Sequence, residues 1–86
     1  MTKQTKSPNR YVVVLEKVDD GYNGCIGAYR GVTYFTKTRL KFGDFVFINK
    51  NGYAQKRKTE MYVGRAIKMC KYVCVKDLIK AIKKLK

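Results

Sequence analysis

Few side chains in this sequence could act as acid–base catalysts. It has no histidine, and six Asp and Glu stand against twenty Lys and Arg. Asp19 and Asp20 lie in a predicted turn, and Asp44 precedes an apolar run, which favours a second turn. Glu16 alternates outward on a predicted strand, where pairing with Lys or Arg is its expected role. The sequence therefore predicts a binding protein rather than an enzyme.

The three cysteines, Cys25, Cys70 and Cys74, do not form a recognisable metal-binding motif. Structural zinc sites almost always have four ligands, and there is no histidine to complete this set. An odd number of thiols favours free cysteines in a reducing compartment. The glycines are spaced for turns between strands and not for a phosphate-binding loop. We expect no metal and no cofactor.

Basic and aromatic side chains are the more informative group. The formal net charge of +14 makes the chain repel itself unless a polyanion or an acidic protein neutralises it. Single-stranded nucleic acid is bound by cations that hold phosphates and rings that stack on bases. The candidate nucleic-acid-binding residues are Arg30, Tyr34, Lys37, Arg39, Lys41, Tyr53, Lys56, Arg57, Lys58, Lys80 and Lys83. The competing interpretation is that the rings fill the core and the lysines only solvate the surface.

The composition favours a non-catalytic, mainly electrostatic nucleic-acid-binding protein, with single-stranded DNA or RNA slightly preferred to duplex. The alternative is a small basic inhibitor or assembly factor that docks on an acidic protein surface. Either role would suit a phage or viral accessory protein. The pattern does not specify an oligomeric state.

Two features bear on location. No segment approaches the ~18–20 apolar residues that cross a bilayer, and residues 1–10 lack the apolar centre of a signal peptide. We expect a cytoplasmic or nucleoid-associated protein that is not secreted and has no membrane partner. A basic amphipathic C-terminal helix could still lie on an anionic membrane, although this helix has no Trp or Phe anchor.

Alternating and apolar runs, separated by turn residues, predict a β-rich domain with one helix. Expected turns lie at 19–21, at Arg30-Gly31 and at Asn51-Gly52. Gly64 within the last strand indicates a bend or a close backbone approach. The predicted strands cover residues 10–18, 22–29, 32–38, 45–49, 53–58 and 60–69.

The segment KFGDFVFINKNGYAQ, followed by VGRAIKM, resembles the SH3-like barrels at Gly43, Asp44, Val46, Gly64 and Ala66. In those barrels a Gly-Asp step begins a strand, a hairpin follows, and a glycine-containing strand returns. An OB-like barrel is the alternative. The expected fold is a five- or six-stranded half-open barrel with a C-terminal helix.

The domain limits follow from these elements. Residues 1–9 are predicted to form a flexible basic arm, and residues 10–86 are predicted to form one domain with the barrel at 10–72 and the helix at 75–85. An apolar stripe on that helix is expected to pack on the barrel and close an open end. The stripe consists of Val75, Leu78, Ile79, Ile82 and Leu85.

Overall fold

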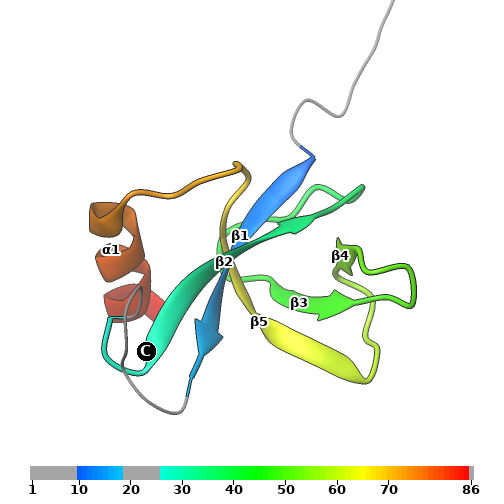
Figure 1. The fold of residues 1–86 in the computed structure, drawn as a ribbon, viewed down its shortest axis with the longest axis horizontal. Coiled ribbons are helices and arrows are strands. Elements are labelled where there is room, and N and C mark those ends of the chain that lie inside the picture. The colour runs from blue at the N-terminus through cyan, green and yellow to red at the C-terminus, as the bar shows by residue number, and fades with distance from the viewer. Residues whose placement is uncertain (1–9, 19–25, 86) are drawn as a thin grey trace, which may run out of the picture.

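A computed structural model describes residues 10–18 and 26–85 (Figure 1). The five strands form one antiparallel sheet in the order β2-β1-β5-β3-β4, and one helix follows at the C-terminal end. The elements are β1 (Tyr11–Lys17), β2 (Tyr29–Phe35), β3 (Phe45–Ile48), β4 (Ala54–Gln55), β5 (Met61–Lys68) and α1 (Val75–Leu85). The predicted basic arm, residues 1–9, lies outside the described residues, so the proposed domain limits remain a prediction.

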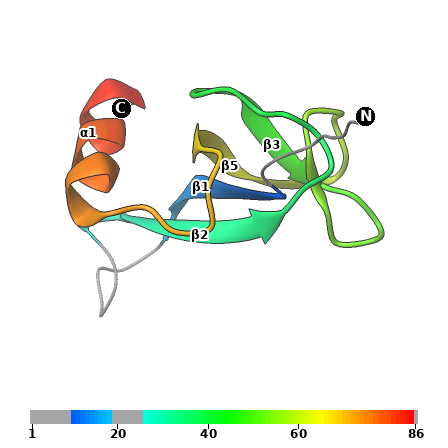
Figure 2. The same ribbon diagram turned by 90° about the horizontal axis from the view of Figure 1, so that it is seen from above.

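β1 is an interior strand covered on both faces, as its uninterrupted apolar run predicts. Val12 and Val14 point to one face and pack against Val46 of β3. Val13 and Leu15 point to the other face and pack against α1. We call these the inner and outer faces. Figure 2 shows α1 beside one end of the sheet, with β3 toward the other end.

The sheet is not closed into a barrel. Among residues 10–18 and 26–85, the backbones of the edge strands β2 and β4 are joined at a single isolated bridge, between Thr36, just after β2, and Ala54. The Thr36 side chain is fully buried, and its hydroxyl donates to the Ala54 carbonyl at 2.6 Å. The prediction of a β-rich domain with a C-terminal helix is therefore confirmed, but the predicted barrel is replaced by an open antiparallel sheet. β4 has two residues, which is too short to form a continuous ladder with β2.

β2 begins at Tyr29, three residues before the strand predicted at 32–38. Arg30-Gly31, expected to be a turn, lies inside β2, where Gly31 pairs with Leu15 of β1. The turn instead lies at Gly27, where φ is 61°, between the bridged residues Ile26 and Tyr29. Residues 22–25 of the separate strand predicted at 22–29 lie outside the described residues. Pairing along all of β1 outweighs the local turn propensity of an Arg-Gly pair.

The hairpin predicted at Asn51-Gly52 is confirmed. Gly52 has a φ of 86°, and the Asn49 side-chain oxygen accepts hydrogen bonds from the backbone N–H groups of Asn51 and Tyr53. The return strand is shorter than predicted and ends at Gln55. The basic run at 56–58 therefore lies beyond β4 and not on a strand.

Gly64 makes the close backbone approach that the sequence predicts. Its φ is +149°, and a Cβ atom there would collide with the carbonyl oxygen of Leu15 on β1. The register between β3 and β5 shifts at this position, because Val63 is an extra residue between Tyr62, opposite Phe47, and Gly64, opposite Val46. This bulge lets β5 bend while it stays paired with both β1 and β3.

The C-terminal helix is confirmed at Val75–Leu85, but its buried stripe is narrower than predicted. Leu78 and Ala81 are the buried residues, whereas Val75 and Ile79 are exposed. Gly31 lies beneath Leu78, so the helix can approach β2 closely. In residues 10–18 and 26–85 no helix has the length and apolar character needed to cross a membrane.

Candidate nucleic-acid interface

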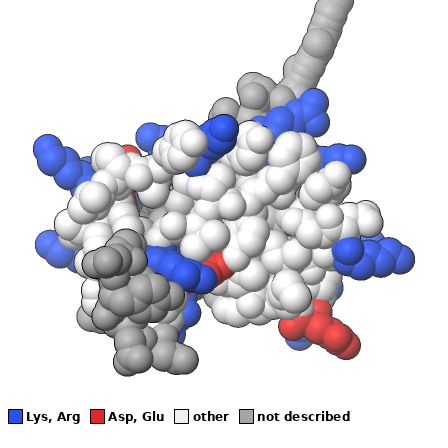
Figure 3. All heavy atoms as spheres, viewed as in Figure 1, with Lys and Arg blue, Asp and Glu red and all other residues white. Residues whose placement is uncertain are grey.

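Most of the cationic side chains that the structure describes form no ion pair with a described carboxylate. Among the residues that the structure describes, three ion pairs form: Arg30 with Glu16, Lys56 with Asp44, and Lys68 with Asp77. In the view of Figure 3, Lys and Arg stand around much of the outline, and Asp and Glu occupy little of the surface. Carboxylates therefore neutralise little of the positive charge that the described residues carry.

Six of the predicted cations come from two segments that the fold brings together. The Thr36–Ala54 bridge places the chain after β2 beside the chain around β4. The Lys37 ammonium nitrogen lies 5.0 Å from the centre of the Tyr53 ring. We call the exposed set Lys37, Arg39, Lys41, Lys56, Arg57 and Lys58 the basic cluster.

Asp44 organises one side of the basic cluster. Its carboxylate accepts a hydrogen bond from the Lys41 backbone N–H at 2.8 Å and forms an ion pair with Lys56 at 3.6 Å. The Asp44 N–H donates to the Lys41 carbonyl, which closes the turn before β3. The predicted turn role of Asp44 is thus confirmed. One carboxylate also connects the two segments that carry the cluster.

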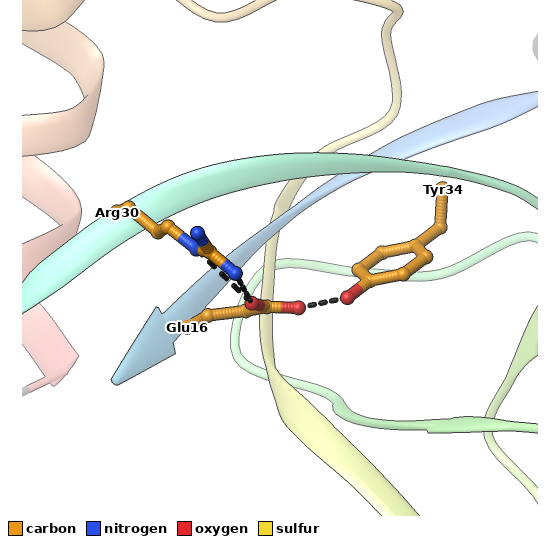
Figure 4. A network of polar contacts seen from close by, with 3 residues as sticks. All are labelled: Glu16, Arg30 and Tyr34. Carbon is orange, nitrogen blue, oxygen red and sulfur yellow. Dashed lines mark hydrogen bonds and ion pairs between the residues drawn. The ribbon is translucent and has the colours of Figure 1, made fainter. Parts of the chain in front are cut away.

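Arg30 and Tyr34 lie apart from the basic cluster, in a network with Glu16 on the inner face (Figure 4). The guanidinium of Arg30 forms an ion pair with Glu16 at 3.2 Å, as predicted for Glu16. The Tyr34 hydroxyl donates to the other carboxylate oxygen, and its ring packs against the inner core. The Glu16 side chain is only 12% exposed. Tyr34 therefore contributes to packing and does not offer a free ring for stacking.

Lys80 and Lys83 lie on α1, which contacts β1, β2 and β5. Figure 1 shows α1 and β4 at opposite ends of the sheet, so these lysines lie away from the part of the basic cluster around β4. Phe42, which follows Lys41 in the chain, does lie beside α1, with the Lys84 ammonium nitrogen 5.4 Å from the centre of its ring. Lys80 and Lys84 line a hollow of about 170 Å³ together with Phe42. The predicted site residues thus fall into three groups. The first is the basic cluster with Tyr53, the second is Arg30 and Tyr34 beside Glu16, and the third is Lys80 and Lys83 on α1.

A row of rings beside the basic cluster was not predicted. Tyr11 meets Phe35 edge-on at 5.6 Å, and Phe35 meets Tyr53 at 5.1 Å. Lys71 lies 5.7 Å from the Tyr11 ring. Tyr11 and Phe35 are directly paired in the register of β1 and β2. Strand pairing, which the local sequence pattern does not reveal, brings these rings together.

Two of the cysteines can be placed. Cys70 is half-buried and its thiol donates to the Tyr72 carbonyl, whereas Cys74 is exposed. Cys25 lies outside the described residues. Within the part of the chain that the structure describes, no three metal-ligating side chains come together. The absence of a metal and a cofactor stays a prediction from the sequence.

No family model, curated protein or solved structure is similar enough to this chain to count as a match. The function must therefore be argued from the arrangement of its own side chains.

Proposed function

We propose that this protein binds nucleic acid without catalysis, mainly through electrostatic contacts with phosphates and with some preference for single strands. The observation that carries the proposal is that the fold brings the two segments of the basic cluster together, with Asp44 ion-paired to Lys56 and the Tyr53 ring beside Lys37. Cations grouped beside a ring match a chain of phosphates that carries stackable bases. A cytoplasmic or nucleoid-associated location fits such a role.

The charge balance explains why a polyanion is the favoured partner. Placing exposed cations close together costs free energy, and a bound phosphate chain removes that cost while it releases counterions. The curved five-stranded sheet is also in keeping with the proposed likeness to SH3-like or OB-like barrels, some of which bind oligonucleotides. A viral or phage accessory role remains part of this proposal.

Salt dependence tests the proposal directly. With about six phosphate contacts, the logarithm of the association constant for single-stranded DNA should fall against the logarithm of salt concentration with a slope of roughly −4 to −5. Fluorescence anisotropy of a labelled oligonucleotide measures this slope. Retained affinity with no salt dependence would contradict electrostatic binding. No binding to single strands or duplex at low salt would favour the acidic-protein alternative.

Removing charge from the basic cluster should weaken binding more than removing the same charge elsewhere. Arg39→Ala/Arg57→Ala/Lys58→Ala removes three exposed cations that have no ion pair within the described residues. We expect the salt slope to become shallower by about 2, because each lost phosphate contact reduces it by roughly 0.7–0.9. The melting temperature should change little, since surface substitutions alter stability by about 0.5 kcal/mol or less each.

Lys76→Ala/Lys80→Ala/Lys83→Ala is the matched comparison, because it removes the same charge from exposed positions of α1. It should reduce affinity less than the cluster variant. Equal losses in the two triple variants would mean that binding follows total charge and that the basic cluster is not the principal site.

A further inference from the structure

The helix covers only part of the outer face of the sheet. Leu78 and Ala81 pack over Leu15 and Ile67 of β1 and β5. Farther along the same face, β3 and β5 carry Phe45, Phe47, Tyr62 and Arg65, which we call the aromatic patch. Phe45 pairs with Arg65, and Phe47 pairs with Tyr62, so the four side chains share one face. α1 therefore leaves an aromatic region uncovered.

The patch is exposed although its rings are large. Phe45 is 56% exposed and Tyr62 is 51% exposed. The Tyr62 ring lies 6.0 Å from Phe45 and 5.4 Å from Phe47, between ring centres. Contiguous exposed rings of this kind on a small protein usually mark a binding surface.

A cation is fixed within the patch. The Arg65 guanidinium lies 4.3 Å from the centre of the Phe45 ring, and its Nε donates to the Gly43 carbonyl at 2.6 Å. This hydrogen bond holds the positive charge against the ring. Rings with a fixed cation suit a ligand that presents flat aromatic groups and negative charge together.

Tyr62 separates two hollows in the surface. One, of about 300 Å³, lies between β5 and the end of α1 and is lined by Lys17 and Arg65 as well as Tyr62. Its described lining contains no carboxylate. The other, broad and open, has Lys50 and Glu60 in its lining. A chain crossing Tyr62 would therefore meet cations on both sides of the ring, with the more positive surroundings in the smaller hollow.

We propose that the aromatic patch is a base-stacking surface for single-stranded nucleic acid, in addition to the Tyr53 ring, an inference that rests on the proposed function. Bases stack on Phe45 and Tyr62, and phosphates lie near Lys17 and Arg65. β3 and β5 are interior strands of the sheet, and their exposed outer face presents side chains, so this face binds through side chains. A second copy of the chain is a poorer occupant, because two faces of a protein with charge +14 repel each other.

Ring-removing and ring-conserving substitutions test the stacking. Phe45→Leu and Tyr62→Leu keep apolar bulk but remove the ring, whereas Phe45→Tyr and Tyr62→Phe keep it. The ligands are an oligothymidylate of about 20 nucleotides, longer than the usual site on one small domain, and heparin, a polyanion without bases. We expect each Leu variant to bind the oligonucleotide about ten-fold more weakly, with unchanged heparin affinity and salt slope. The ring-conserving variants should match the parent protein.

Several outcomes would overturn the inference. Parent-like oligonucleotide affinity in both Leu variants would remove the patch from the site while leaving the proposed function intact. Equal losses for heparin and oligonucleotide would show that the rings act through folding or charge. If the parent protein binds no nucleic acid, the proposed function and this inference fail together. A parent dimer that becomes monomeric in the Leu variants, seen by sedimentation, would make the patch a self-association surface.

Cross-linking gives a measurement that needs no variant. Oligonucleotides containing 5-iodouracil, irradiated with the parent protein, should attach to Phe45 or Tyr62, as mapped by mass spectrometry. Attachment confined to other residues would contradict stacking on the patch.

Discussion

Gly64→Ala is expected to destabilise the domain by at least about 3 kcal/mol, a large part of the stability of so small a protein. Two costs combine. The φ of +149° strains any residue with a Cβ, and that Cβ would press against the backbone of Leu15, which belongs to a paired strand and cannot move aside cheaply. Urea unfolding followed by circular dichroism measures the change in free energy of unfolding.

Gly52→Ala is the control for this prediction. Gly52 also has a positive φ, of 86°, but a Cβ there would meet no atom within 4 Å. The substitution should therefore cost only the backbone strain, about 1 kcal/mol. If the two alanine variants are equally stable, the contact between β5 and β1 is looser than described and the bulge does not depend on glycine.

Leu78→Ala should have the next largest effect on stability. The residue is 7% exposed and belongs to the outer-face core with Val13 and Leu15. Truncation leaves a cavity and should lower the free energy of unfolding by about 2–4 kcal/mol. For a domain of this size the melting temperature should fall by at least about 10 °C.

Ile79→Ala is the matched control for Leu78→Ala. The two residues are neighbours on α1, but Ile79 is 38% exposed, so its truncation should cost roughly 1 kcal/mol or less. Unchanged melting temperatures for both variants would mean that α1 does not dock on the sheet. A larger loss at Ile79 would mean that the helix is rotated relative to the orientation described.

Short-range patterns predicted much of the fold. The apolar run at Val12–Leu15 indicated a strand covered on both faces, and Asn51-Gly52 indicated a hairpin, because each signal depends on neighbours in sequence. The position of α1 followed from its helical spacing. The prediction of which side of α1 is buried was less accurate. The stripe pattern does not show that Gly31 leaves space for the Leu78 side chain, whereas Ile79 stays exposed at the edge of the contact with the sheet.

The candidate site was harder to predict, because pairing between distant strands creates it. Charge identified the basic cluster, but Arg30 and Tyr34 share the inner face with Glu16, a placement that depends on the register of β1 and β2. Phe45 and Phe47 belong to a run that is apolar on both faces, and this pattern does not show which face stays uncovered. Their outer face stays exposed because α1 ends before it covers them, and no local sequence pattern predicts this.

The strand order has a consequence for how the chain folds. β1 is the first strand in sequence, yet it pairs with β5, so Val14 lies opposite Ala66 and must find a partner about 50 residues away. The apolar run of β1 cannot pair with β5 until most of the chain has been synthesised. Closing such a long loop is entropically slow, so we expect folding in milliseconds to seconds and not microseconds. During synthesis, the exposed Val-rich strand would be the segment most prone to aggregate.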